Sequence, residues 1–227
     1  MIYVTVPGDT VSSISRQSGV PVWKIIYDNQ LGEEGELTVG QALLLLKPQE
    51  SAEIREDLYV TGYAYPFIEP YVLEMAFPAL NELLVFSYGF TFEGELVPPI
   101  QDETWMIQLA WENGIEPMLV LTPFTQGVFN NQLIQTLVEE ESVRENVITN
   151  LLKVVEEKGY VGVDVDFEYV RAQNREGYAE FVGELRAAMN EKGYRVSVAL
   201  APKTSSDQKG LLYEGIDYAL LGEQADR

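Results

Sequence analysis

The sequence contains neither cysteine nor histidine among its 227 residues. Without cysteine there can be no disulfide, no thiolate metal site and no cysteine nucleophile. Without histidine, Ser-His-Asp hydrolysis, His-ligated zinc and imidazole acid–base chemistry are all excluded. The acid–base groups that remain are carboxylates, tyrosine and lysine, so any reaction that this chain catalyses must use those groups.

Basic residues are also scarce, because 15 Lys and Arg stand against 36 Asp and Glu, for a formal net charge of −21. Nucleic acids and anionic membrane surfaces repel such a chain, so we expect neither as a partner. No apolar run approaches the roughly 20 residues that span a bilayer. Residues 1–10 show neither the basic start nor the apolar segment of a signal peptide. We therefore expect no membrane insertion and no signal peptide.

The stretch YVGVDVDFEYV at residues 160–170 places three carboxylates at alternate positions. Side chains of a strand point to opposite faces in turn, so Asp164, Asp166 and Glu168 should share one face, roughly 6.5–7 Å apart along the backbone. The apolar residues between them line the other face. Crowded carboxylates raise the pKa of at least one member, which is how a Glu can stay protonated near neutral pH and act as a general acid. The alternatives are a solvated acidic edge strand and a carboxylate metal site.

This stretch resembles the active-site strand of the family 18 glycoside hydrolases, which reads D-G-apolar-D-apolar-D-apolar-E on the fourth strand of a TIM barrel. The matching residues are Gly162, Asp164, Asp166, Phe167 and Glu168. Val161 stands where the family has its first Asp, at the least critical position. The resemblance implies a TIM barrel and hydrolysis of a β-1,4 bond next to N-acetylglucosamine, with no cofactor and no metal ion.

The resemblance also implies a role for each carboxylate in a substrate-assisted, retaining mechanism. Glu168 protonates the glycosidic oxygen and later acts as the base for the attacking water. The N-acetyl oxygen of the substrate attacks the anomeric carbon and forms an oxazolinium ion. Asp166 orients the acetamido group and stabilises its positive charge, while Asp164 hydrogen-bonds Asp166 and shares a proton with it.

From Leu58 onward, near-continuous apolar strands alternate with helices, which indicates an α/β fold with a parallel sheet covered by helices. We expect strands at residues 59–65, 83–90, 116–122, 160–170 and 195–202. We expect helices at residues 69–80, 102–113 and 141–158 and around 178–193, with a polar loop before residue 141. Residues 220–227 read as the approach to a sixth strand. The prediction is a partial TIM barrel of about the first five βα units.

Aromatic residues stand at the expected carboxyl ends of the strands, which is where βα barrels hold their active sites. Tyr63, Tyr88 and Tyr169 are therefore candidate substrate-binding residues, with rings that could stack on sugar rings. The alternative for each is core packing, because buried aromatic side chains mostly fill volume.

Residues 1–48 form a separate βααβ unit with a PGDT turn, an N-Q-L helix end and a VGQ turn. The unit resembles a LysM module, and such modules bind N-acetylglucosamine-containing glycans of peptidoglycan or chitin. The groove of a LysM module lies between its first strand–helix loop and its second helix–strand loop. This implies contacts from Gly8, Asp9, Thr10, Asn29, Gln30 and Leu31. Alternatively, Gly8 and Asp9 only form a turn and Leu31 belongs to the core.

The polar stretch at residues 49–57 reads as a linker between the LysM unit at 1–48 and the barrel unit at 58–227. A TIM barrel typically takes about 250 residues and eight βα units. We therefore hypothesise that the chain is a truncated form with reduced or no activity.

The combination of a LysM unit with a family 18 domain resembles the bacterial spore-germination enzymes that degrade cortex peptidoglycan. We therefore expect a glycosidase that is anchored to glycan and associated with the spore coat, the cortex or the cell wall. The alternatives are a chitinase, a non-catalytic protein that binds peptidoglycan or chitin, and a structural protein of the coat.

Overall fold

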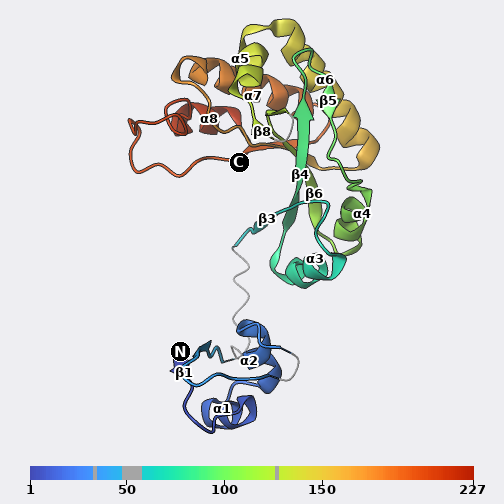
Figure 1. Cartoon of the computed structure of the whole chain (residues 1–227). Helices are drawn as coiled ribbons and strands as arrows, with labels where there is room; N and C mark the ends of the chain where they lie inside the picture. Colours follow the sequence, from blue (N-terminus) through green and yellow to red (C-terminus); the bar gives the residue numbers. More distant parts are fainter. Residues whose placement is uncertain (33–34, 48–57, 126–127) are drawn as a thin grey trace. The chain divides into compact units, whose positions relative to one another are not determined.

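The computed structural model describes residues 1–32, 35–47, 58–125 and 128–227 (Figure 1). The chain divides into two compact units, Met1–Leu58 and Tyr59–Arg227. The linker predicted at residues 49–57 lies outside the described residues. None of the helices in the described ranges is long and apolar enough to cross a membrane.

The first unit has the predicted βααβ order. Its elements are β1 (Ile2–Val4), α1 (Val11–Ser18), α2 (Val22–Asp28) and β2 (Ala42–Leu44). β1 and β2 pair in antiparallel fashion, and both helices bury apolar residues against them. Thr10 caps α1 in a reciprocal capping box with Ser13, and Gly19 ends the helix in the left-handed conformation at φ 75°. The residues at the two ends of α1 therefore explain where this helix begins and ends.

The second unit is built on five parallel strands in the order β10-β9-β6-β4-β3. These strands are β3 (Thr61–Ala64), β4 (Glu82–Phe90), β6 (Glu116–Leu121), β9 (Gly162–Val165) and β10 (Arg195–Val198). A short strand, β5 (Leu96–Val97), pairs antiparallel with the end of β4, and β7 (Phe124–Thr125) pairs with β8 (Val128–Phe129). This confirms the α/β class and the parallel sheet.

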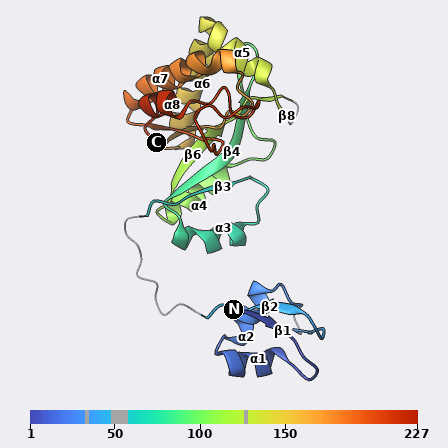
Figure 2. The ribbon, with the colours of Figure 1, turned by 90° about the vertical axis from the view of Figure 1, so that its left-hand side faces the viewer.

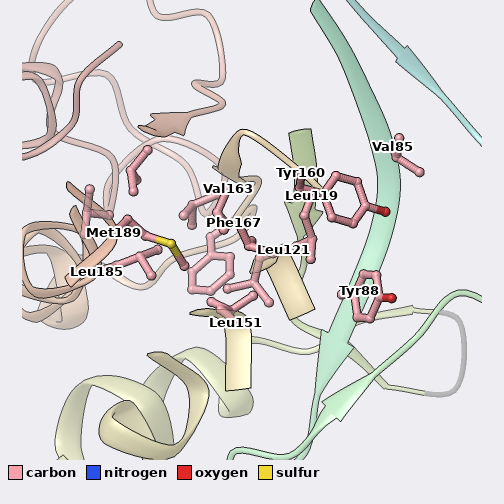
Figure 3. Packing of buried hydrophobic residues seen from close by; sticks show 14 of the residues in the cluster. Val85, Tyr88, Leu119, Leu121, Leu151, Tyr160, Val163, Phe167, Leu185 and Met189 are labelled. Atoms are coloured by element: carbon pink, nitrogen blue, oxygen red, sulfur yellow. The ribbon is translucent and has the colours of Figure 1, made fainter. Parts of the chain in front are cut away.

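Helices follow the strands and cover one face of the sheet, as Figure 2 shows for α6 and α7. They are α3 (Pro70–Ala76) with η1 (Phe77–Ala79), α4 (Thr104–Glu112), α5 (Asn131–Glu139), α6 (Glu141–Lys158), η2 (Ala172–Asn174) with α7 (Arg175–Asn190), and α8 (Tyr218–Gln224). On this face Val163 and Phe167 pack among Leu151 of α6 and Leu185 and Met189 of α7 (Figure 3). The predicted apolar side of the acidic stretch therefore faces the helices.

The sheet is curved. Its curvature brings side chains of non-adjacent strands together on the concave face, which is opposite the face that the helices cover. Tyr63 on the edge strand β3 donates a hydrogen bond to Asp164 on β9, although β4 and β6 lie between those strands. Val120 is the register partner of Asp164 and belongs to a small apolar cluster of this face. The concave face is thus apolar in the middle and carries carboxylates toward the carboxyl ends of the strands.

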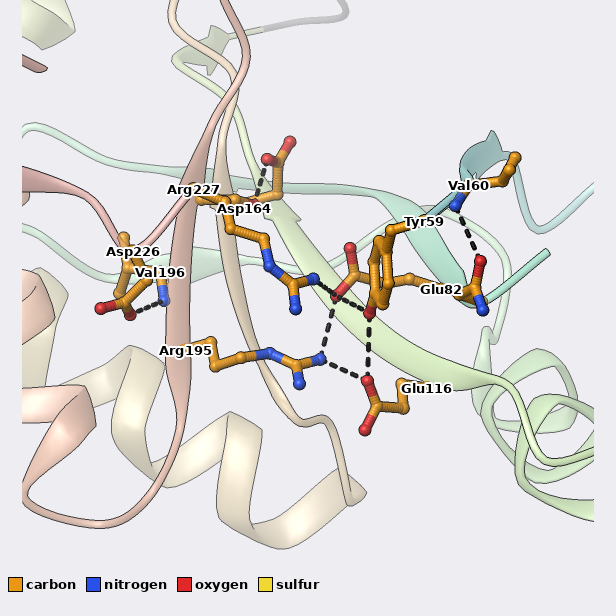
Figure 4. Close-up of polar contacts among 11 residues, drawn as sticks. Tyr59, Val60, Glu82, Glu116, Asp164, Arg195, Val196, Asp226 and Arg227 are labelled. Atoms are coloured by element: carbon orange, nitrogen blue, oxygen red, sulfur yellow. Dashed lines mark hydrogen bonds and ion pairs between the residues drawn. The ribbon is translucent and has the colours of Figure 1, made fainter. Parts of the chain in front are cut away.

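An ionic cluster lies at the amino ends of the strands, where Glu82, Glu116 and Arg195 are the first residues of β4, β6 and β10 (Figure 4). The Arg195 guanidinium contacts a carboxylate oxygen of Glu116 at 2.6 Å and one of Glu82 at 3.0 Å. The Tyr59 hydroxyl donates to the same two carboxylates, and the Arg227 guanidinium lies 4.0 Å from the centre of the Tyr59 ring. The cluster ties non-adjacent strands together and closes this end of the concave face.

The structure corrects two of the predicted elements. Where a polar loop was expected, α5 forms, because Leu133, Ile134 and Leu137 are spaced to bury one helix face. Where the approach to a strand was expected, α8 forms, because the Asp217 carboxylate caps its first turn. After α8, the main chain of residues 226–227 hydrogen-bonds to β10, as a neighbouring strand would.

Candidate active site

The acidic stretch crosses the end of β9, whose regular pairing stops at Val165 rather than continuing to Val170 as predicted. Asp164 lies in the strand, and the Asp166 amide still donates to the Leu121 carbonyl of β6 at 2.9 Å. Glu168 follows in irregular backbone. The alternation of faces nevertheless persists, because Phe167 is buried while Asp166 and Glu168 stay partly exposed.

Asp164 is buried and held by two hydroxyl groups. Its Oδ2 accepts from the Tyr63 hydroxyl at 2.8 Å, and its Oδ1 accepts from Ser197 Oγ of β10 at 2.5 Å. Burial raises the pKa of Asp164 above its ordinary value, and the two hydroxyls oppose that rise. The hydrogen bond predicted between Asp164 and Asp166 is not among the contacts of the described residues.

Sequence reasoning missed Ser197, although a signal for it exists. Ser197 stands between Val196 and Val198 of β10, and in the parallel register it is the partner of Asp164. A partly buried polar side chain in a strand favours a hydrogen-bond partner, and the neighbouring strand supplies one here. The pairing of β9 with β10 was predictable, but its register was not.

Asp166 has a pKa raised to about 6. The first cause is burial, which disfavours the charged carboxylate, and the second is the negative charge of Asp164 and Glu168 nearby. Crowding in the acidic stretch predicts only the second of these causes, and burial is the larger one. Near neutral pH, Asp166 can therefore exchange a proton without a large free-energy cost.

The raised pKa of Asp166 predicts a pH-dependent effect of removing its charge. An unfolded Asp titrates near 3.9, so between that pH and about 6 the folded protein holds the extra proton. The stability that this group contributes is fully present below about pH 4 and is lost as the pH rises through about 6. We expect Asp166→Asn to raise the melting temperature more at pH 7.5 than at pH 4, as measured by calorimetry.

The control for this prediction is Glu74→Gln, which removes the same charge from an exposed position on α3. If Asp166→Asn and the control shift the melting temperature equally at both pH values, the charged Asp166 carboxylate does not destabilise the fold and the prediction is wrong.

A pocket of about 340 Å³ opens at the carboxyl ends of the strands, and Asp166 and Glu168 both line it. Tyr63 and Tyr65, from β3 and the loop after it, and Phe86 of β4 form its aromatic side. Residues 199–202, which follow β10, complete the wall. The pocket therefore joins Asp166 and Glu168 to an aromatic surface, and buried Asp164 does not line it. This arrangement can protonate a leaving group and stabilise a nearby cation.

The three candidate tyrosines have different environments. Tyr63 lines the pocket, and Tyr169 directly follows Glu168, 40% exposed and in the left-handed conformation at φ 59°. Tyr88 is 3% exposed, and its hydroxyl donates to buried Glu103 at 2.6 Å. The prediction for Tyr88 is therefore corrected, because its ring belongs to the core and cannot reach a ligand.

In the LysM-like unit, three of the candidate side chains hold loops in place. Asp9 accepts from the Tyr3 hydroxyl and the Val6 amide, and Thr10 caps α1. The Asn29 side chain bonds to the main chain of Ile25 and Leu44. The contacts of Asp9 fit its alternative role as a turn former.

The other three candidates of this unit are Gly8, Gln30 and Leu31. Gly8 and Gln30 adopt positive φ angles of 90° and 51° in turns. Leu31 is partly buried against the core of the unit, as its alternative reading held.

Two family descriptions match the chain. Residues 3–45 match the LysM domain, and residues 127–227 match glycosyl hydrolases family 18, which includes the acidic stretch.

Known proteins show the same likeness. A cortical fragment-lytic enzyme of Bacillus subtilis is 33% identical over 152 residues, which are 66% of this chain and 35% of that enzyme. The crystal structure of the spore cortex-lytic enzyme SleL of Bacillus megaterium matches with a TM-score of 0.70 and 27% identity, over 99% of this chain and 52% of that one. The crystal structure of a class V chitinase of Pseudomonas fluorescens shares the fold, with a TM-score of 0.68 and 24% identity. That match covers 74% of this chain and 52% of the chitinase. The chain thus spans about half or less of the length of these relatives.

Proposed function

We propose that this chain is part of a glycosidase of family 18 that is related to the Bacillus spore cortex-lytic enzymes. The support is the match of residues 3–45 to the LysM domain, the match of residues 127–227 to glycosyl hydrolases family 18, and the likeness to those enzymes. The proposed reaction is hydrolysis of a β-1,4 bond next to N-acetylglucosamine in peptidoglycan. The observation that carries this proposal is the shared pocket of Glu168 and Asp166, with Asp164 buried behind them.

In this reaction Glu168 donates its proton to the glycosidic oxygen, and the substrate's own N-acetyl oxygen attacks the anomeric carbon. Asp166 faces the acetamido group and stabilises the oxazolinium cation. The same burial and negative charges that raise the pKa of Asp166 also raise the free energy of its charged form, as long as no cation lies in the pocket. A cation beside it relieves that cost, so the interaction strengthens as the positive charge develops.

Asp164 works through Asp166 and does not touch the substrate in this scheme. Both Asp164 oxygens accept from hydroxyl groups, so Asp164 is held as an acceptor. Asp164 then acts on Asp166 through its negative charge, which is one of the causes that raise the pKa of Asp166. Glu168 later acts as the base that activates water, which completes retention at the anomeric carbon.

The LysM domain supplies attachment to an N-acetylglucosamine-containing glycan, such as peptidoglycan or chitin. We infer that it keeps the catalytic domain on its insoluble substrate and associates the protein with the spore cortex or the cell wall. A local concentration effect of this kind raises the chance of productive binding without any new catalytic contact.

The test is to incubate the full-length protein with purified spore cortex peptidoglycan and, in parallel, with insoluble chitin. We expect soluble fragments that carry N-acetylglucosamine at the new reducing end, identified by mass spectrometry after reduction. Sedimentation with the polymer measures binding separately from release. Binding without release would replace this proposal by a non-catalytic glycan-binding role, and faster release from chitin would assign a chitinase.

A further inference from the structure

An arginine lies close to the acidic stretch. Arg171 follows Glu168 by three residues, in the segment that connects β9 with η2 and α7. Three residues of main chain span at most about 10 Å. Arg171 does not line the pocket that Asp166 and Glu168 share. It therefore lies beside the place of the reacting bond and not at that place.

Two neutral side chains hold the Arg171 guanidinium. Its Nη1 donates to Oε1 of Gln135 at 2.7 Å, and its Nη2 donates to Oδ1 of Asn131 at 3.2 Å. Both acceptors belong to α5, which starts at the carboxyl ends of the strands because it follows β6. The rings of Tyr169 and Phe129, with centres 6.3 Å apart, join the same two segments. The guanidinium is thus fixed at the edge of the sheet where the pocket opens.

These contacts do not neutralise the charge of Arg171. Amide oxygens are neutral acceptors, and among the residues that the structure describes no carboxylate oxygen lies within 4.0 Å of this guanidinium. Arg144 and Arg195, in contrast, both bind carboxylates. In the same described part of the chain, Nε of Arg171 has no hydrogen-bond partner and is not one of the buried nitrogen atoms. The guanidinium therefore keeps N–H groups that a ligand can reach.

The ligand group that suits such a guanidinium is a carboxylate. Arginine presents its N–H groups as a planar fork that a carboxylate can bind with both oxygens. The chain as a whole has a net charge of −21 and repels acidic groups. A fixed cation beside the pocket offsets that repulsion locally, which favours an acidic group attached to a ligand in the pocket.

We propose that Arg171 binds a carboxylate of a peptide substituent on the glycan strand that Glu168 cleaves. The inference rests on the proposed function and goes beyond it by naming a residue that distinguishes peptidoglycan from chitin. Peptidoglycan carries short peptides with free carboxylates, whereas chitin is an uncharged polymer of N-acetylglucosamine. A peptide of three or four residues spans up to roughly 10–14 Å, so it reaches Arg171 from a ring in the pocket.

The test uses a matched pair of substrates with the full-length protein. One is a peptide-bearing peptidoglycan fragment, and the other is the same fragment after its carboxylates are converted to amides. We expect wild type to have the lower KM for the acidic fragment. Arg171→Gln should raise the ratio of the acidic to the amidated KM about three- to tenfold and leave the ratio of the kcat values unchanged, because a binding contact is lost. Arg171→Lys keeps the charge without the fork and should retain part of the preference.

The matched control is Arg175→Gln. Arg175 is exposed at the start of α7, so the change removes the same charge four residues further along the chain. Its KM ratio should equal that of wild type, and all the proteins compared keep the same LysM domain. Added salt should weaken the preference of wild type, because ions screen the attraction between the carboxylate and the guanidinium.

A binding readout separates this proposal from the proposed hydrolysis. The side-chain amide NMR signals of Asn131 and Gln135 should shift when the acidic fragment is added and not when the amidated one is. If neither fragment is cleaved but this difference appears, the Arg171 site stands and the hydrolysis proposal fails. A purely structural role of Arg171 would raise both KM values together and leave their ratio unchanged. That result, an equal change of the ratio in Arg175→Gln, or amide signals that do not distinguish the fragments would overturn the Arg171 proposal.

Discussion

Replacing Glu168 by Gln is expected to lower the turnover of cortex peptidoglycan by about 10²–10⁴-fold, the usual contribution of a general acid. Gln keeps the size and hydrogen bonding of the side chain but has no proton to give to the glycosidic oxygen. Glu168 lines the pocket at the carboxyl ends of the strands and is partly exposed, so the change should not disturb the core. Release of reducing ends measures turnover in the full-length protein, and sedimentation with peptidoglycan should show unchanged binding.

The matched control is Glu180→Gln, at an exposed position on α7 away from the pocket. It removes the same charge and should keep the turnover of wild type. Turnover by Glu168→Gln within a factor of ten of wild type would remove Glu168 from the role of acid.

The second large effect is expected for Gly162→Ala. A Cβ atom at Gly162 would overlap the backbone carbonyl of Arg195 on the paired strand β10, and the three atoms that it would meet are all backbone. Backbone atoms cannot move aside as a flexible side chain does, so β9 and β10 must separate. We expect a loss of about 3 kcal/mol or more in the free energy of unfolding, at the upper end of overpacking.

The loss should be visible as an earlier urea transition of the barrel unit. Separation of the two strands would also disturb Asp164, whose Oδ1 accepts from Ser197 of β10, and Arg195, which anchors the ionic cluster. Gly222→Ala is the control, because a Cβ at that position in α8 meets nothing within 4 Å, and Ala favours a helix. Equal transition midpoints for the two variants would contradict the close approach of the strands.

Much of the local structure was predictable. The helix at Glu141–Lys158 has the predicted bounds, because an 18-residue apolar stripe and a closing glycine are strong, independent signals. The strands at β4 and β6 begin or end within one residue of the prediction. The α5 helix was missed because polar residues at its start outweighed three buried apolar ones.

Side-chain partners were much less predictable. Tyr63 and Tyr88 look alike in the sequence, since each stands toward the end of an apolar strand. Tyr63 points to the concave face and reaches Asp164, while Tyr88 lies in the core and donates to Glu103. The two tyrosines lie on opposite faces of the sheet because the register of β4 becomes irregular after Val85, before Tyr88.

The amino-acid sequence alone determined which acid–base groups this protein has, and it placed three carboxylates on one face of a single segment. No cysteine or histidine is present, and a period of two puts Asp164, Asp166 and Glu168 opposite the apolar residues that the helices bury. These are local properties of the chain. Only the tertiary structure decided that Tyr63 and Ser197 hold Asp164, that Tyr88 is core, and that aromatic residues line the pocket of Asp166 and Glu168. The reason is that strand order, register and sheet curvature bring together residues far apart in the sequence, such as Tyr63 and Asp164 at 101 positions, and no local pattern encodes such contacts.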